Sequence, residues 1–167
     1  MHQDDNIRKE IKAMQKTKPS GGGAMYGFLE CTVKQFMTRT VVTVTRQTTM
    51  LELAGLFEKH DFNAFPVVEH GKVLGIISKF DFLRAFAFTT GHVVPHYNEL
   101  MSRRAGEVMT EAIVDVDPTS PLTRVLHLMV GLKIRSFPVM SANDRLEGII
   151  SREDIMRALK ETTEESQ

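Results

Sequence analysis

The chain has 167 residues, 42% of them hydrophobic, so it can bury a core and has the size of one compact domain. Lys and Arg together match Asp and Glu at 21 each, so no overall field favours nucleic acid or an anionic membrane. The single cysteine, Cys31, excludes an internal disulfide or a cysteine zinc cage. With no long apolar stretch and a polar N-terminus, the sequence predicts a cytoplasmic protein without a membrane span.

Two stretches of the chain match each other at a spacing of about 72 residues. Met37-Thr38 opens the first copy and Met109-Thr110 opens the second, and a β-branched segment follows each pair, at 41–44 and 113–116. We expect these two segments to be strands. Apolar residues at helical spacing come next and predict one helix in each copy. They are Leu53, Leu56 and Phe57 in the first copy, and Val125, Leu128 and Met129 in the second.

Each predicted helix leads into a Phe-Pro-Val strand and a polar turn, which together indicate a β-hairpin. The second hairpin strand, Gly-Ile-Ile-Ser, spans 75–78 in one copy and 148–151 in the other, and a second helix follows it. Each copy therefore has the order strand, helix, strand, strand, helix, and the chain has an α+β fold. A single copy is too short to bury its apolar surface, so the two copies should pack together.

Ser-x-x-Asp occurs at the start of both second helices, as Ser78 with Asp81 and as Ser151 with Asp154. A glycine three residues before each serine allows close backbone approach, which would suit a nucleoside phosphate. An ionised Asp accepts hydrogen bonds only and so suits a pair of sugar hydroxyls. The alternative is that Ser and Asp only cap the helix, and the two roles are compatible.

In combination, these repeated motifs resemble paired CBS domains, also called a Bateman module. The resemblance covers 33–88 and 105–160; it leaves an N-terminal helix and flexible linker at 1–32, an inter-repeat linker at 89–104 and an acidic tail at 161–167. It implies two repeats packed with pseudo-twofold symmetry, adenosyl ligands held in clefts between them, and dimers formed through the helices.

The resemblance also implies which residues line the two clefts. The first cleft would contain Ser78, Asp81, Ile113, Val114, Arg135, Ser136 and Pro138. The second cleft would contain Ser151, Asp154, Val41, Val42, Asn63, Ala64 and Pro66. Arg135 can clamp a phosphate with its planar charged group, whereas Asn63 at the matching position offers a neutral amide. We therefore expect the first cleft to be the stronger nucleotide site.

The segments outside the repeats carry weaker signals. Ile7, Ile11 and Met14 predict a short amphipathic helix, and three glycines make 16–23 a flexible break. His92 and His96 have the spacing of a helical metal pair, but Gly91 and Pro95 disfavour a helix there, so we expect no metal site. The apolar run from Phe80 to Phe88 predicts helix packing or a dimer interface.

These features favour a regulatory module that binds AMP, ADP or ATP between its repeats and signals to a protein partner whose identity the sequence does not name. We expect a homodimer that needs no cofactor and is not an enzyme, since the sequence has no Ser-His-Asp set, metal-ligand cluster or phosphate-binding loop. The alternatives are a structural dimerisation module with vestigial clefts and a sensor of S-adenosylmethionine.

Overall fold

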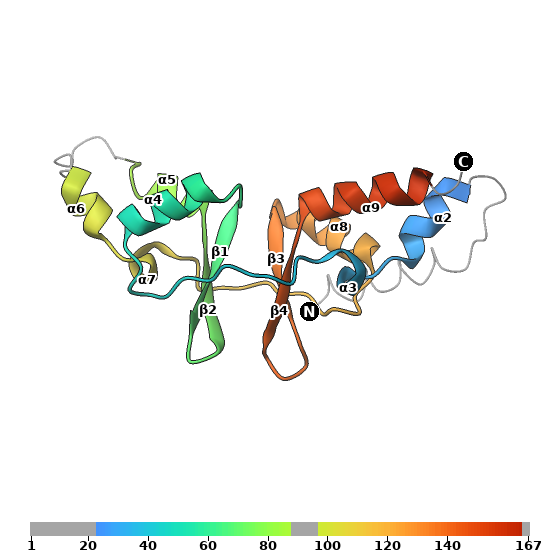
Figure 1. Ribbon diagram of the computed structural model, residues 1–167, viewed down its shortest axis with the longest axis horizontal. Coiled ribbons are helices and arrows are strands. Elements are labelled where there is room, and N and C mark those ends of the chain that lie inside the picture. Colours follow the sequence, from blue (N-terminus) through green and yellow to red (C-terminus); the bar gives the residue numbers. More distant parts are fainter. Residues whose placement is uncertain (1–22, 88–96, 165–167) are drawn as a thin grey trace.

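A computed structural model describes residues 23–87 and 97–164. Two halves lie side by side, and each is built on an antiparallel hairpin with helices at one end (Figure 1). The α+β fold and the two repeats are confirmed. The first half contains α4 (Met50–Lys59), β1 (Ala64–Glu69), β2 (Lys72–Ser78) and α5 (Lys79–Arg84). The second half contains α8 (Leu122–Leu132), β3 (Ser136–Met140), β4 (Leu146–Ser151) and α9 (Arg152–Glu164).

Turn residues and helix-capping residues determine where the hairpins turn and where the helices begin. Residues Glu69 and Lys72 pair across the first hairpin, and the turn between them, His70-Gly71, has φ values of 50° and 77°. Two positive φ angles match the twist of the flanking strands in a two-residue hairpin turn. Thr49 and Glu52 form a reciprocal capping box at the start of α4. The repeat order of helix, hairpin and helix therefore follows from turn and cap residues as well as from the apolar pattern.

Four short helices were not predicted, two before the repeats and two at the start of them. They are α2 (Gly23–Glu30), α3 (Val33–Phe36), α6 (Tyr97–Ser102) and α7 (Ala105–Val108). Helix α2 starts within the predicted flexible break, α6 lies within the predicted linker, and α9 extends into the predicted acidic tail. The predicted N-terminal amphipathic helix, the histidines at 92 and 96, and Phe88 lie outside the described residues.

The prediction of strands at 41–44 and 113–116 is wrong. These segments are extended but form isolated bridges only, Val44 with Val67 of β1 and Val116 with Val139 of β3. The reason is that each segment crosses from one half to the other, as Figure 1 shows, and so cannot run along a single strand. We call 37–44 and 109–116 the crossing segments.

Because of this crossing, the short helix before each crossing segment packs in the opposite half: α3 in the second half and α7 in the first. Val33 of α3 and the adjacent Met37 are buried in a core with Phe137 and Ile150 of the second repeat. In the same way, Ala105, Val108 and Met109 are buried in a core with Phe65 and Ile77 of the first repeat. The two cores therefore share the chain between them, and neither repeat is complete by its own sequence.

Gly75 and Gly148 are required where the crossing segments meet the hairpins. A Cβ atom at Gly148 would lie 2.7 Å from the carbonyl oxygen of Thr38 and 3.0 Å from Met37 Sδ. A Cβ at Gly75 would lie 2.8 Å from the Thr110 carbonyl oxygen and 2.9 Å from Met109 Sδ. The sequence suggested that these glycines allow a ligand to approach; the structure shows that the close neighbour is the backbone of the opposite repeat.

We predict that Gly148→Ala lowers the free energy of unfolding by about 1–3 kcal/mol, the usual cost of overpacking, because a neighbouring carbonyl group blocks the new methyl group. The matched control is Gly55→Ala in the exposed middle of α4, where a Cβ would meet nothing within 4 Å. That change should raise stability by up to about 1 kcal/mol because alanine favours the helix. Urea denaturation measures both, and equal effects would contradict the packing explanation.

Candidate functional site

Both Ser-x-x-Asp motifs form helix caps, as their spacing predicted. In the first repeat, the Ser78 backbone N–H and hydroxyl donate to Asp81 Oδ2 over 2.9 and 2.6 Å, and the Asp81 N–H donates to Ser78 Oγ over 3.1 Å. In the second repeat, Ser151 and Asp154 repeat this pattern at 2.8, 2.9 and 3.4 Å. Each motif therefore fixes its carboxylate at the junction between a hairpin and its following helix.

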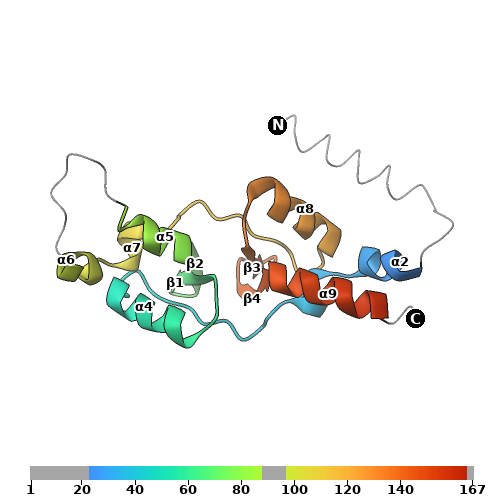
Figure 2. The ribbon, with the colours of Figure 1, turned by 90° about the horizontal axis from the view of Figure 1, so that it is seen from above.

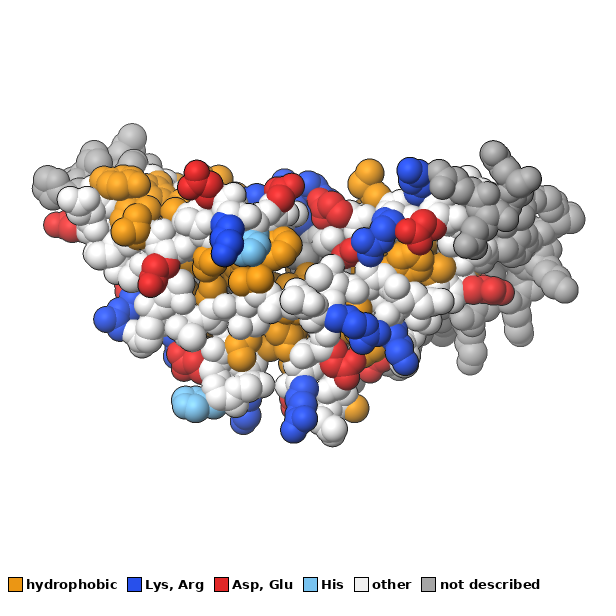
Figure 3. Space-filling view, viewed as in Figure 1, with side chains coloured by type: hydrophobic (Ala, Val, Ile, Leu, Met, Phe, Trp, Pro, Cys, Tyr) orange, Lys and Arg blue, Asp and Glu red, His pale blue; other side chains and the backbone are white. Residues whose placement is uncertain are grey.

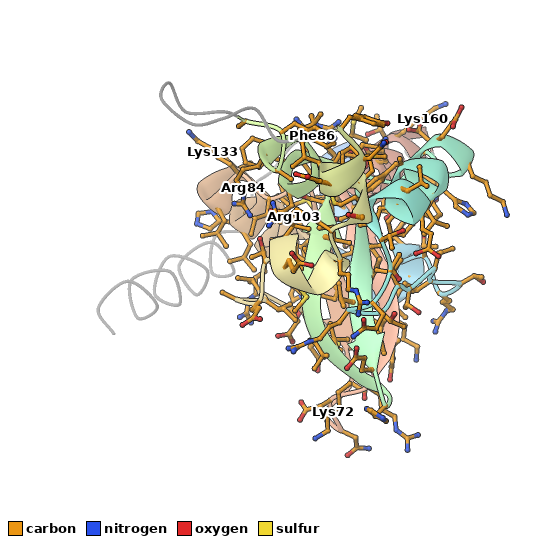
Figure 4. The ribbon with its side chains drawn as sticks, turned by 90° about the vertical axis from the view of Figure 1, so that its left-hand side faces the viewer. Lys72, Arg84, Phe86, Arg103, Lys133 and Lys160 are labelled. Atoms are coloured by element: carbon orange, nitrogen blue, oxygen red, sulfur yellow. The ribbon has the colours of Figure 1, made fainter. Side chains whose placement is uncertain are left out.

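The second oxygen of each carboxylate ties that helix to the opposite repeat. Arg84 donates to Asp81 Oδ1 over 2.9 Å and to the Val108 carbonyl oxygen of α7 over 3.5 Å. Arg157 donates to Asp154 Oδ1 over 2.9 Å and to the Phe36 carbonyl oxygen of α3 over 2.7 Å. Figure 4 shows Arg84 at the helical end of its half, far from Lys72 at the hairpin turn. Both carboxylates are buried, so these contacts also compensate the loss of hydration.

A pocket of about 230 Å³ opens at the second cleft. Residues predicted for that cleft make up much of its lining: Val41, Val42, Asn63, Ala64, Ser151 and Asp154. The exception is Pro66, which is buried in β1 and whose carbonyl oxygen accepts a hydrogen bond from the Val44 N–H at 3.0 Å. Hydrophobic side chains gather near the middle of the face in Figure 3, where the halves meet. The structure therefore joins both repeats around one pocket.

Further lining residues were not predicted from the sequence: Thr38, Thr40, Asp61, Phe62, Ile149 and Glu153. Thr38 is the threonine of the Met-Thr pair, and Phe62 directly precedes Asn63, so both lie beside residues that the motifs had marked. The Phe62 ring stacks on His60, with 5.1 Å between ring centroids and 8° between planes. Phe62 is also 37% exposed, so part of this supported ring remains open to a ligand.

The charged residues that line the pocket are all acidic. Asp61 forms an exposed ion pair with Lys79 at 3.5 Å, and Glu153 pairs with Arg152 at 2.8 Å. Desolvation raises the pKa of Glu153, but hydrogen bonds from Arg152, its own backbone and Ser151 outweigh it and lower that pKa overall. The basic partners lie outside the lining, so the pocket combines carboxylates with hydroxyl groups, one amide and apolar surface.

The residues predicted for the first cleft are more dispersed. Ser136 lines the pocket of the second cleft, and Ile113 lines a separate hollow of about 270 Å³ together with Lys72 of β2. Val114 is exposed, and Pro138 is buried. Arg135 is exposed and makes no ion pair with any described residue, so its guanidinium group is available to an anion.

Over the described ranges, 23–87 and 97–164, no group of His, Cys, Asp and Glu side chains could hold a metal ion. Within the same ranges, no helix is both long and apolar enough to cross a bilayer. The site consists of an apolar and acidic pocket built at the junction of two repeats, and comparison with known proteins assigns it to a family. The CBS domain family model matches residues 33–88 and 105–161.

The chain belongs to the CBS-domain family. Among solved structures, the CBS domain pair of protein MJ0100 is 27% identical with a TM-score of 0.66, over 78% of this chain and 97% of that one. That CBS pair was crystallised with 5′-methylthioadenosine and S-adenosyl-L-methionine. The CBS-domain protein ATU1752 of Agrobacterium tumefaciens is 30% identical, with a TM-score of 0.67, over 77% of this chain and 98% of that chain.

Curated relatives place the same CBS pair in proteins of different length. The CBS domain-containing protein YhcV of Bacillus subtilis is 32% identical over 74% of this chain and 81% of its own length. Protein MJ1225 of Methanocaldococcus jannaschii is 27% identical over 75% of this chain. The chain spans about half of MJ1225, at 46%, and 22% of an L-aspartate semialdehyde sulfurtransferase from the same organism. CBS pairs of this kind therefore also occur as parts of longer proteins, including an enzyme.

We predict that Asp81→Ala lowers the free energy of unfolding by about 2–3 kcal/mol, because it removes the buried hydrogen bonds that the carboxylate accepts from the Ser78 N–H, the Ser78 hydroxyl and Arg84. From sequence alone we would expect the fold to tolerate this change, since it removes no core volume; the buried hydrogen bonds explain the difference. Asp61→Ala is the control, because Asp61 is exposed and its ion pair is weak. Chemical denaturation with no difference between the two variants would contradict this structural role.

Proposed function

We propose that this CBS pair is a regulatory module that binds an adenosyl ligand in the pocket of the second cleft and transmits its occupancy to a protein partner. The observation that carries the proposal is the pocket itself, whose lining combines Val41, Val42 and Asn63 of the first repeat with Ser151 and Asp154 of the second. A ligand held there would contact both repeats at once. Differential affinity for two arrangements of the repeats is what a ligand needs to act as a signal.

The lining suits a nucleoside in each of its parts. Val41, Val42 and Ile149 offer apolar surface to a purine, and the exposed part of Phe62 offers an aromatic face. The Asp154 carboxylate suits sugar hydroxyls, which are hydrogen-bond donors. A volume of about 230 Å³ lies just below the usual range for small-molecule pockets, roughly 300–1,000 Å³. This size favours a nucleoside over a triphosphate.

The charge of the lining supports the same choice. Asp61, Glu153 and Asp154 would repel a polyphosphate, whereas they would attract a neutral hydroxyl donor or a cationic sulfonium. The ligands of the MJ0100 CBS pair have this chemistry, so we propose 5′-methylthioadenosine or S-adenosylmethionine in the second cleft. Binding of AMP, ADP or ATP rests instead on Arg135 and the first cleft, and the test below separates these two cases.

We also propose that the module is a homodimer in the cytoplasm. Figure 2, seen from above, shows α4 and α5 on one half and α8 and α9 on the other, and Figure 1 shows these helices at the end opposite the hairpin turns. Several apolar side chains on this layer are exposed, including Phe80 at 71% and Leu83 at 65% on α5, and Met156 at 67% on α9. Twofold dimers are the commonest way to cover such a surface. The apolar run from Phe80 to Phe88 therefore serves both predicted purposes in different residues. Phe82 and Phe86 pack on the core of the first half, whereas Phe80 and Leu83 are exposed.

We predict that 5′-methylthioadenosine binds one site per chain, and binds more tightly than ATP or GTP. Arg135→Ala should leave this binding unchanged, because Arg135 does not line the pocket. Phe62→Ile should weaken it by about 0.5–1.5 kcal/mol, since isoleucine, the residue at matching position 134, retains bulk but not the ring. Isothermal titration calorimetry measures all three.

Two outcomes would overturn this assignment. Binding of AMP or ATP in preference to the nucleoside, lost with Arg135→Ala, would move the site to the first cleft. No heat with any adenosyl compound would favour the alternative, a structural module with vestigial clefts.

For the dimer, we predict that the double variant Leu83→Glu with Met156→Glu shifts the protein to a single-chain mass, because each charge would be buried at the interface. Val114→Glu is the control, since Val114 is exposed on a crossing segment and not on the helical layer. Light scattering during gel filtration gives the mass. A wild-type protein of single-chain mass at micromolar concentration would contradict the proposal.

A further inference from the structure

The two Ser-x-x-Asp motifs differ in how many of their acceptor positions are already occupied. An ionised carboxylate offers about four lone-pair positions. Asp81 accepts from the Ser78 N–H, the Ser78 hydroxyl and Arg84, and it accepts a fourth hydrogen bond from Thr110 Oγ at 3.2 Å. From the residues that the structure describes, Asp154 accepts only the first three equivalents, two from Ser151 and one from Arg157. Asp154 therefore retains an acceptor position for a ligand, and Asp81 does not.

The difference in occupied acceptor positions arises at Thr38 and Thr110, which occupy equivalent positions. Each is the threonine of the Met-Thr pair that opens its repeat. Thr110 is half-buried, and its hydroxyl donates to Asp81. Thr38 is exposed, lines the pocket of the second cleft, and has no side-chain hydrogen bond to a described residue. The backbones of both threonines bridge to the opposite hairpin in the same way, to Ile149 and Ile76. Only the side-chain partner differs between the two.

We propose that Thr110 is a latch that occupies the ligand-accepting position of Asp81 and so restricts adenosyl ligands to the second cleft. This inference rests on the proposed function. A sugar hydroxyl that enters the first cleft must displace a donor from Asp81 before it can bind there. Ser78 and Arg84 also hold the helix cap and α7, so their displacement disturbs the fold, whereas the Thr110 hydroxyl can rotate away.

The expected size of the effect follows from the bond that must be broken. A hydrogen bond to a charged group corresponds to roughly tenfold to hundredfold in an equilibrium constant. Affinity at the first cleft should therefore be lower by about this factor while the latch is in place. Thr110 would then determine the stoichiometry of binding, at one ligand per chain, although both repeats carry the same motif.

The test is Thr110→Val, which keeps the shape of the side chain and removes the hydroxyl donor, with Thr38→Val as the matched change in the second cleft. Titration of wild-type protein with 5′-methylthioadenosine should give one site. Thr110→Val should give a second site, and Thr110→Ser, which keeps the hydroxyl, should restore one. Asp81→Asn added to Thr110→Val should remove the gained site, while Thr38→Val alone should gain none.

The outcomes separate the latch from the proposed function. If wild-type protein binds nothing, the proposed function fails, and a site gained by Thr110→Val would still support the latch. If Thr110→Val binds with the stoichiometry and affinity of wild-type protein, or if wild-type protein already fills two sites, the latch is wrong. Thermal melting checks that each variant is folded; if Thr110→Val is unfolded, Thr110→Ala replaces it with the same expectation.

Discussion

The contact between each crossing segment and the opposite hairpin is the constraint on which the rest of the structure depends. The backbone of Thr38 exchanges two hydrogen bonds with Ile149, both 2.9 Å long, and Thr110 exchanges two with Ile76 at 2.9 and 3.0 Å. A side chain at Gly75 or Gly148 would occupy the space that this contact needs. Each hairpin is therefore bordered on one edge by its own repeat and on the other by its neighbour. Because the crossing segments are exchanged between the repeats, each hydrophobic core contains residues of both repeats.

The exchange also explains why a ligand could report on the arrangement of the repeats. The pocket of the second cleft is walled by the crossing segment 38–42 and by β4, so it exists only where the halves meet. Asp154 connects that pocket through Arg157 to the Phe36 carbonyl oxygen at the end of α3. A ligand that forms a hydrogen bond with Asp154 would therefore lie beside the hydrogen bond from Arg157 to Phe36, which joins the two repeats. The exposed apolar layer formed by the helices is a surface through which this change could reach a second molecule.

The sequence predicted what depends on local pattern, namely both hairpins, both longer helices of each repeat and the capping role of Ser78 and Ser151. It did not predict α3 and α7, because a helix of four residues is too short to show periodicity. The local pattern did not show the exchange of crossing segments, because it depends on contacts between residues distant in sequence; the family resemblance alone placed Val41 and Val42 beside Ser151 and Asp154. The two threonines cannot be told apart in the sequence, because both follow methionine in matching motifs; only their hydroxyl partners differ.

The most direct measurement of the central claim is a crystal structure of the chain grown with 5′-methylthioadenosine. We predict that the nucleoside lies in the pocket of the second cleft, with its sugar hydroxyls within hydrogen-bond distance of Asp154 and its base against Val41, Val42 and Phe62. The first cleft should be empty, with the Thr110 hydroxyl still on Asp81. A nucleoside bound at Asp81 with the pocket beside Asp154 empty would contradict the account.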